Sequence, residues 1–426
     1  MDPLPRLKER LERGEAVVAG VLSGTSADGI DVALVSFPER DRVDRPGLED
    51  VGKPDVLAFE TRAFPEGVAA RLRTLLDGEA SDLASIACLS RDLGIAFGQA
   101  ARGLAHSRGI ALDLVGSHGQ TVFHHDGRAD FGRATLQLGD AAFLAEGARA
   151  VVVHDFRAAD LAAGGEGAPL SALCDALLFE GIERPALVIN LGGMANVTHL
   201  PQVPKEGPPE GPSRGRVLSF DTGPAGSLLD GLARRLLGRP FDPDGSFASR
   251  GRPDPGLLGE LLSHPFLDRS PPKSTGRDTF GEPWVEGIVV RARERGLFAR
   301  GPEDLLATAV EFVAQSIARA TRSFLPGPAR TWVMCGGGAR NASLARALIR
   351  TLGSEPKPSE SFGVDPDARE ALVFAVLAAR AVLGIPSTDP GATGARRGRI
   401  LGSITPYVAL GNGGERCESE KAGPLR

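Results

Sequence analysis

The sequence predicts an α/β fold of two similar lobes, each with a mixed sheet flanked by helices, and a cleft between them. The chain has 426 residues, more than one hydrophobic core usually organises. Apolar runs typical of strands alternate with helical patterns along most of this length. The same unit, a strand followed by a glycine turn and a second strand, occurs at residues 20–35 and again at 186–200. Two lobes whose glycine turns face one cleft explain this repetition.

The first lobe is expected to span residues 16–150. Residues 134–153 have the pattern of a strand, a helix and a strand, and apolar residues at helical spacing predict a helix between Asp82 and Gly109. Further strand signals lie at 17–22, 30–37, 56–61 and 113–117. Residues 1–15 are predicted to form a short charged helix outside the fold. These residues and 411–426 are expected to be flexible ends.

The second lobe is expected to span residues 151–384. Residues 201–215 are rich in proline and glycine, which is typical of a flexible insertion. The segment from about 385 to 410 could return to the first lobe. Strands are predicted at 186–191, 197–200, 216–220 and 332–334, and helices at 170–179, 227–237, 304–325, 342–352 and 367–383.

The overall composition is that of a soluble globular protein. Hydrophobic residues make up 42% and charged residues 24%, and the net charge of −5 argues against a nucleic-acid-binding surface. No signal-peptide core follows the first charges, and no apolar run approaches the roughly 18 residues of a membrane helix. The four scattered cysteines form no CxxC pair, which indicates reduced thiols and no metal or disulfide framework. We therefore expect a cytoplasmic protein without nucleic-acid or membrane partners.

Three glycine turns have the chemistry of a phosphate or nucleotide site. Gly24-Thr25-Ser26 and Gly192-Gly193 each place backbone amides at a strand junction, where they can surround an anion, although an ordinary hairpin turn would look similar. Gly336-Gly337-Gly338 leaves a flat surface for a base or ribose before the helix that follows Asn341. Near the first turn, Asp28 or Asp31 could bind Mg²⁺ or could simply cap the turn.

Asp221 is the strongest catalytic candidate. It ends an apolar strand and precedes glycine and proline, so its carboxylate should project rigidly into the cleft as a general base. A capping role for the helix 227–237 fits less well, because Asp221 lies several residues too early.

Other polar residues are candidates for binding a substrate. Residues 116–126 contain three of the seven histidines, including His118, next to Thr121. With His154 and Asp155 they could be imagined as a metal site, but their spacing matches no ligand signature, so a polar substrate surface is favoured. Arg157, beside Asp155, could hold a carboxylate or sugar hydroxyls, or form a structural ion pair. Glu370 could enter the cleft or lie on a solvated face.

Together these segments resemble the anhydro-N-acetylmuramic acid kinase family of the actin-like, sugar-kinase and heat-shock-chaperone superfamily. The resemblance implies two actin-like (ribonuclease H-like) lobes with a nucleotide cleft between them. It covers nearly the whole chain in order: SGTSADGID (23–31), GSHGQTVFHH (116–125), LGD (138–140), DFRAADLAAGGEGAPL (155–170), NLGGMANVT (190–198), FDTGP (220–224), PKSTGRD (272–278), CGGGARN (335–341) and DPDAREALVFA (365–375).

The resemblance implies that a base-activated water opens the anhydro ring of the sugar and that ATP, with Mg²⁺, phosphorylates the released 6-oxygen. The product would be N-acetylmuramic acid 6-phosphate, in peptidoglycan recycling. Asp221 is then the base, and a homodimer is expected. The implied nucleotide contacts are Gly24, Thr25, Ser26, Ala27, Asp28, Gly29, Ile30, Asp31, Gly192, Gly193, Gly336, Gly337, Gly338 and Asn341. The implied sugar contacts are His118, Thr121, Asp155, Arg157 and Glu370.

One departure from the family keeps alternatives open. Where the family usually continues DTGP with Gly-Asn, this chain has Ala225-Gly226-Ser227 and lacks the asparagine side chain. A plain sugar kinase acting on a free hydroxyl, or an inactive ATP-binding sensor, would use the same glycine turns. A metal hydrolase using His118, His124, His125 and Asp155 is a third alternative and would need zinc rather than ATP.

Overall fold

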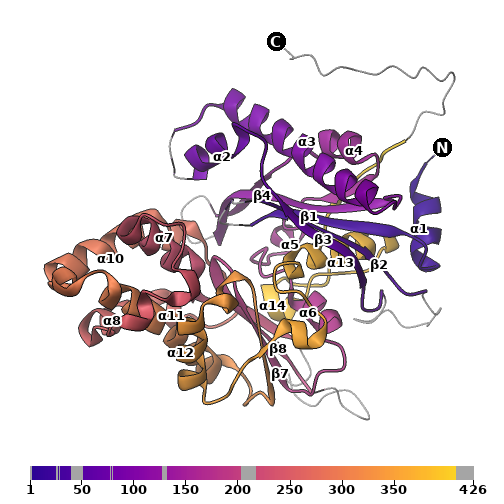
Figure 1. Cartoon of the computed structure of the whole chain (residues 1–426). Helices are drawn as coiled ribbons and strands as arrows, with labels where there is room; N and C mark the ends of the chain where they lie inside the picture. The colour runs from indigo at the N-terminus through magenta and orange to yellow at the C-terminus, as the bar shows by residue number, and fades with distance from the viewer. Residues whose placement is uncertain are drawn as a thin grey trace.

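The computed structural model describes residues 2–24, 27, 29–39, 51–76, 78, 80–126, 132–202 and 217–408. In this part the chain forms two mixed sheets flanked by helices, in agreement with the predicted α/β class (Figure 1). Both sheets begin with an antiparallel three-strand meander and continue with two parallel strands beside the first strand of the meander. The structural repeat indicated by the two strand–glycine–strand units is therefore present.

The first sheet has the strand order β12-β6-β4-β1-β2-β3, with β5 paired to β4. Both of its faces are buried, which explains why β1 is apolar without alternation: Val18 and Leu22 face one core, and Ala19 and Val21 face another. Its strands are β1 (Val17–Ser23), β2 (Ile30–Ser36), β3 (Asp55–Arg62), β4 (Leu114–Asp126), β5 (Arg133–Leu138), β6 (Val151–His154) and β12 (Ser403–Thr405).

The second sheet has the order β11-β10-β7-β8-β9. Its strands are β7 (Ala186–Leu191), β8 (Met194–Leu200), β9 (Leu218–Pro224), β10 (Thr331–Cys335) and β11 (Lys357–Pro358).

Helices cover the two sheets. In the first half, α3 and α4 pack together on one face of the first sheet, and in the second half α11 packs on β8 and β9 (Figure 1). The helices are α1 (Leu4–Glu12), α2 (Val68–Leu76), α3 (Leu83–Ser107), α4 (Ala141–Ala148), α5 (Ala158–Ala162), α6 (Ala172–Leu178), α7 (Gly226–Leu237), α8 (Pro255–Leu262), α9 (Arg277–Phe280), α10 (Glu282–Glu294), α11 (Glu303–Phe324), α12 (Ala342–Leu352), α13 (Arg369–Leu383) and α14 (Pro390–Thr393). Short 3₁₀ turns include η3 (Pro265–Asp268) and η5 (Gly337–Arg340).

Helix α13 lies against the first sheet, although its sequence position places it at the end of the expected second lobe. Two glycines allow this close approach: a Cβ atom on Gly20 would lie 1.7 Å from the Ala371 carbonyl oxygen, and one on Gly116 would lie 2.1 Å from that of Phe374. The same core contains residues of the second sheet, such as Val188 and Val333. Helix α13 therefore connects the two halves.

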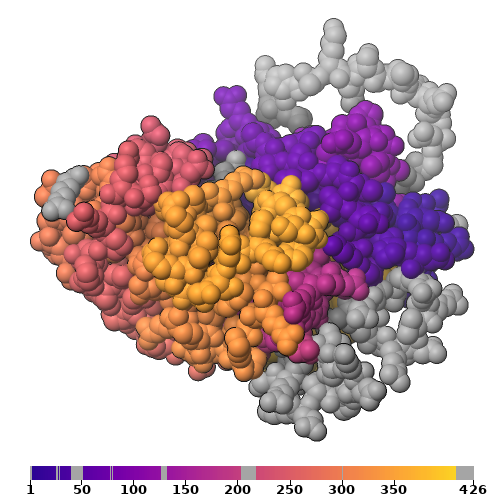
Figure 2. Space-filling view, turned by 60° about the horizontal axis from the view of Figure 1, so that its bottom comes forward, coloured from indigo at the N-terminus to yellow at the C-terminus, as the bar shows by residue number. Residues whose placement is uncertain are grey.

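The structure bears on three further expectations about the lobes. Helix α1 is not outside the fold, because Leu7 and Leu11 are buried in the core around α13. The boundary drawn at residue 150 cuts the first sheet, because β6 begins at Val151 and pairs in parallel with β4. Strand β12, from the segment 385–410, pairs with β6 at the edge of that sheet. Figure 2 shows the yellow segment near the C-terminus between the indigo first half and the red and orange second half.

Candidate functional site

Three predicted site segments meet at one edge of the second sheet. Strands β7 and β10 are parallel neighbours, and β9 runs in the same direction because β8 is antiparallel to both β7 and β9. Their carboxyl ends therefore point to the same edge of the sheet, with β8 between β7 and β9. Gly192-Gly193 and Gly336–Gly338 follow β7 and β10 at this edge, and Asp221 is the register partner of Asn196 on β8. Asp221 does not end its strand as expected, because β9 continues to Pro224.

The Gly192-Gly193 turn is held by the first turn of α7. The Gly193 carbonyl accepts hydrogen bonds from the amides of Ala225 and Ser227 at 2.9 and 3.0 Å, and the Gly192 carbonyl accepts one from Gly226 at 2.9 Å. Ala225, Gly226 and Ser227, which follow the position where the resemblance implies Gly-Asn, thus support the turn through backbone groups, which do not depend on side-chain identity. The missing asparagine side chain leaves this support intact.

The third turn has an exposed backbone surface. Gly336 and Gly338 pack against the end of β7, where a Cβ atom on either would lie 2.8 Å from an atom of Leu191. A Cβ on Gly337 would meet nothing within 4 Å, so this residue borders open space. Asn341 accepts a hydrogen bond from the Leu344 amide at 3.0 Å and caps α12. The predicted flat surface is therefore centred on Gly337.

The first glycine turn lies at the corresponding edge of the first sheet. The Gly24 carbonyl accepts hydrogen bonds from the Ala27 amide at 3.1 Å and from Nε2 of Gln120, on β4, at 3.3 Å. Ala27 and Ile30 have buried side chains in the core, so only their backbones are available to a ligand. Asp31 accepts a hydrogen bond from Thr61 Oγ1 at 2.6 Å, and Gly29 packs against Thr61. Thr25, Ser26 and Asp28 lie outside the described residues.

Asp221 is a buried carboxylate with a defined orientation. Its Oδ2 accepts a hydrogen bond from the Thr275 amide at 2.8 Å, and its own amide donates to the Lys273 carbonyl at 3.1 Å. Burial raises the pKa of Asp221 to about 7, against the lowering effects of the Thr275 hydrogen bond and the Arg157 charge. A carboxylate with a pKa near neutrality can accept a proton and release it again at physiological pH.

Arg157 and His118 form a hydrogen-bonded pair. Arg157, directly before α5, donates to the Gly167 carbonyl at 2.7 Å and to His118 Nε2 at 3.0 Å. Burial and the Arg157 charge hold the pKa of His118 well below its ordinary value, so the imidazole is neutral. Because Arg157 can only donate, His118 carries its proton on Nδ1. Its ring stacks on Phe374 at 4.4 Å, and Thr121 Oγ1 lies 3.3 Å from its Nε2.

Arg157 also connects the two sheets electrostatically. Burial lowers the pKa of Arg157 to about 10, while the charges of Asp221, Glu370 and Asp160 raise it. Glu370 Oε1 lies 3.6 Å from the position that a Cβ on Gly192 would occupy, so this carboxylate reaches the second glycine turn. The structure thus brings His118, Thr121, Arg157, Glu370 and Asp221 into one region.

Asp155 follows β6, and its charge raises the pKa of His154, although burial lowers that pKa overall. Asp160 supports the Arg157 segment: it accepts hydrogen bonds from the Gly167 amide and from Thr393 Oγ1, each at 2.7 Å. The structural role of Asp160 was missed because the sequence does not show that residue 393 returns to this position.

The segment 273–275 is the main part of the site that sequence reasoning missed. It belongs to the PKSTGRD motif of residues 272–278, which contains none of the predicted catalytic or binding residues. In the structure it binds both the backbone and the side chain of Asp221.

Unsatisfied polar atoms gather around the two strand edges. These atoms are buried and have no hydrogen-bond partner within the described residues: Ser23 Oγ, Gln120 Oε1, Arg157 Nε, Asn196 Oδ1, Ser227 Oγ, Ser274 Oγ and Thr275 Oγ1. Buried polar atoms are normally paired, so those on residues that adjoin the glycine turns, Asp221 and Arg157 favour a polar ligand or bound water there. Such a region suits the hydroxyl and phosphate groups of a sugar and a nucleotide.

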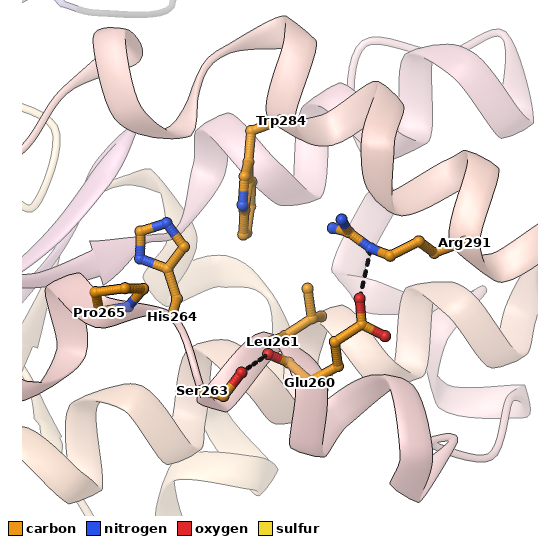
Figure 3. Close-up of a pocket in the computed structure, with 7 residues that line it drawn as sticks. All are labelled: Glu260, Leu261, Ser263, His264, Pro265, Trp284 and Arg291. Carbon is orange, nitrogen blue, oxygen red and sulfur yellow. Dashed lines mark hydrogen bonds and ion pairs between the residues drawn. The ribbon is translucent and has the colours of Figure 1, made fainter.

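A separate pocket of about 200 Å³ lies between α8 and α10 (Figure 3). Trp284 and His264 face it from one side, and Glu260 and Arg291 form an ion pair of 3.0 Å at the other. None of the predicted site residues lines it, and α8 and α10 lie at the outer end of the second half (Figure 1).

The histidines of β4 do not form a metal cluster in the described part of the chain. His124 lies 3.2 Å from Thr135 Oγ1, and His125 lies 3.2 Å from the Gly132 carbonyl, so both face the β5 side of the hairpin. Over the described ranges there is no group of three or more potential His, Cys, Asp or Glu ligands. Within the same ranges, no helix has the length and apolarity that crossing a bilayer requires.

Two repeated sheets with glycine turns at corresponding edges, and a buried carboxylate on the second sheet within electrostatic range of Arg157, are the arrangement expected of a two-lobed enzyme of the sugar-kinase type. The family described as anhydro-N-acetylmuramic acid kinase matches residues 16–407. A relative of that name from Salinibacter ruber is 39% identical over 415 residues, which are 95% of this chain and 99% of the relative. One from Gloeobacter violaceus is 39% identical over 92% of this chain and 98% of its own length.

The chain therefore belongs to the anhydro-N-acetylmuramic acid kinase family, and its enzyme class is that of the ATP-dependent sugar kinases. Among solved structures, the xylulose kinase from Rhodospirillum rubrum is 12% identical and has a TM-score of 0.38 over 85% of this chain and 90% of its own.

Proposed function

We propose that this protein opens 1,6-anhydro-N-acetylmuramic acid with water and transfers the γ-phosphoryl group of ATP to the released 6-oxygen. The observation that carries the proposal is Asp221. It is a buried carboxylate with a pKa of about 7, oriented by the Thr275 amide, within the electrostatic range of Arg157 and at the same sheet edge as two glycine turns. A plain kinase acting on a free hydroxyl would use the same carboxylate to take the hydroxyl proton, so the two reactions are distinguished by the substrate that is turned over.

The chemistry requires a base because the 6-oxygen of this substrate is an ether oxygen. Asp221 takes a proton from water while the water oxygen bonds to the anomeric carbon, and the bond from that carbon to the 6-oxygen breaks. The electron pair left on the 6-oxygen attacks the γ-phosphorus, and ADP leaves. The products are N-acetylmuramic acid 6-phosphate, ADP and the proton held by Asp221.

The residues around Asp221 fit the two substrates. The nucleotide phosphates would contact the backbone of the first two glycine turns, and the nucleoside would lie on Gly337. His118, Thr121, Asp155, Arg157 and Glu370 are proposed to bind the sugar. Mg²⁺ bound with the nucleotide would neutralise phosphate charge, and the half-buried carboxylate of Asp31, beside the first turn, is a suitable oxygen donor for it. A role in peptidoglycan recycling, a cytoplasmic location and a homodimer belong to the same proposal.

The test is an ADP-release assay with 1,6-anhydro-N-acetylmuramic acid on the wild type and on Asp221→Asn. We expect the variant to bind ATP normally and to lose turnover by about 10²- to 10⁴-fold, the usual effect of removing a general base. Normal turnover by the variant would remove Asp221 from the mechanism. The open sugar serves as a second substrate: preference for it would indicate a plain sugar kinase, and ATP binding without turnover of either sugar would indicate a sensor.

A further inference from the structure

Lys273 is completely buried in a cage of three aromatic rings. Its Nζ lies 4.8 Å from the ring centres of Phe266 and Phe324 and 5.8 Å from that of Phe220. The ammonium group also donates to the carbonyls of Phe266 and Leu267, at 3.4 and 3.2 Å. These five groups, which we call the aromatic cage, come from β9, η3 and the end of α11.

The cage lies on the opposite face of β9 from the carboxylate of Asp221. Phe220 directly precedes Asp221, and successive side chains of a strand point to opposite faces. The lysine side chain therefore enters the core behind the strand. Its backbone stays at the strand: the Lys273 carbonyl accepts from the Asp221 amide at 3.1 Å, and two residues later the Thr275 amide donates to Asp221 Oδ2 at 2.8 Å.

Segment 273–275 belongs to neither a helix nor a strand, since it lies between η3 and α9. Its conformation is therefore not fixed by a regular hydrogen-bond ladder. The cage supplies cation–π contacts and charge-assisted hydrogen bonds that fix one end of it. An apolar side chain could fill the same cage without the free-energy cost of removing an ammonium group from water. Stability alone therefore does not require a lysine at this position.

We propose that Lys273 is a positioning residue: its caged ammonium group fixes segment 273–275, and that segment fixes the carboxylate of Asp221 for proton abstraction. This inference rests on the proposed function of Asp221. Lys273 would not touch either substrate.

Charge also links the two residues. The groups that act on Asp221 are Arg157 and Lys273, which lower its pKa, and Glu166, which raises it. Lys273 is itself affected by burial, which lowers its pKa to about 8, and by the charges of Arg269, Asp221, Asp268 and Arg319. Loss of the lysine charge should therefore raise the pKa of Asp221 as well as loosen it.

The experiment compares Lys273→Met, Lys273→Arg and Phe324→Leu with Lys8→Met, a control on the exposed face of α1. We expect Lys273→Met to melt at or above the wild-type temperature, because it removes a buried charge and keeps the volume. Its kcat should fall by about 10- to 100-fold, as is typical when an oriented group loses its support, with little change in KM. The acidic limb of its pH–rate profile should move to higher pH.

Lys273→Arg keeps the charge and should retain the wild-type acidic limb, whereas Phe324→Leu should lower kcat moderately without moving that limb far. If Lys273→Met fails to fold, the same comparison between Phe324→Leu and Lys8→Met decides the question. The inference is overturned if Lys273→Met, or in its absence Phe324→Leu, keeps the wild-type kcat while Asp221→Asn is inactive. Activity in Asp221→Asn would instead overturn the proposed function.

Discussion

At the residue scale, the site depends on burying a carboxylate that water would otherwise keep acidic. Among the described residues, the Asp221 side chain accepts one hydrogen bond, from the Thr275 amide. The positive charges nearby lower the pKa of Asp221 by less than burial raises it. An unburied aspartate would be ionised at neutral pH but too weak a base. Burial of Asp221 therefore costs folding free energy when the carboxylate is charged, and the same burial makes the carboxylate a stronger base.

Asp221→Asn should stabilise the protein at high pH. The folded-state pKa of about 7 exceeds the ordinary value of 3.8, so the folded protein binds an additional proton between these two values. Stability contributed by this group is then lost as pH rises through that window. The melting temperature of Asp221→Asn should exceed that of the wild type at pH 8, and the difference should shrink as the pH falls toward 4. A constant difference across this range would contradict the raised pKa.

The Arg157 side chain should influence both binding and the base. Arg157→Met removes the donor to His118 and Gly167 and one of the charges that lower the pKa of Asp221. We expect kcat/KM for the sugar to fall by about 10- to 100-fold or more, because buried acceptors lose a charged partner. The acidic limb of the profile should move to higher pH. An unchanged KM together with an unchanged acidic limb would show that Arg157 is only structural.

At the element scale, the contact between α13 and the first sheet positions Glu370 and Phe374. Helix α13 approaches β1 and β4 at the two glycines that leave space for its backbone, and Phe374 then stacks on His118. The same helix begins with Arg369, whose guanidinium binds Asp175 of α6 through two hydrogen bonds of 2.6 and 2.9 Å. The geometry of the sugar side of the site thus depends on helix packing.

Gly116→Ala should destabilise the protein. Its Cβ would lie 2.1 Å from the Phe374 carbonyl oxygen, so α13 or β4 must move, at about 1–3 kcal/mol for overpacking. Gly259→Ala in α8 is the matched control: nothing lies within 4 Å of its Cβ, and alanine favours a helix by roughly 0.5–1 kcal/mol. Chemical denaturation of both variants tests this. Equal stabilities would mean that α13 does not pack as described.

The element scale also shows what sequence could and could not predict. The strand–glycine–strand units were predictable because each is local: a short apolar run, a glycine turn and a second apolar run. The burial of α1 was not, because Leu7 and Leu11 pack near α13, from the other end of the chain. The aromatic cage is similar, since Phe220, Phe266 and Phe324 are neighbours only after folding. The apolar sequence of β6 suits either sheet. The sequence therefore did not show that β6 belongs to the first sheet, and the predicted lobe boundary at residue 150 was misplaced.

At the scale of the whole molecule, the two halves share a core. The residues around α13 and α6 include side chains from both sheets, and the buried pair of Arg369 and Asp175 lies within it. Because this shared core belongs to both sheets, the loss of one sheet would expose apolar surface of the other.

Unfolding should therefore occur as one transition, and Arg369→Met should lower its temperature without splitting it. The variant leaves Asp175 buried without its partner, which costs about 3–5 kcal/mol. Arg330→Met, which breaks the exposed pair with Glu183, is the control and should change stability by less than about 1 kcal/mol. Differential scanning calorimetry distinguishes these cases. Two separate peaks in the wild type would show that the halves are independent.

The position of α13 and β12 has a consequence for biosynthesis. During translation strands β1 to β6 of the first sheet leave the ribosome before the second sheet does, yet the helix that covers one face of the first sheet and the strand that extends its edge emerge only after the second sheet. The nascent chain must therefore keep an apolar surface uncovered until residues 369–383 and 403–405 emerge. Premature termination within this stretch would release a chain with that surface exposed, which makes such fragments candidates for chaperone capture or degradation.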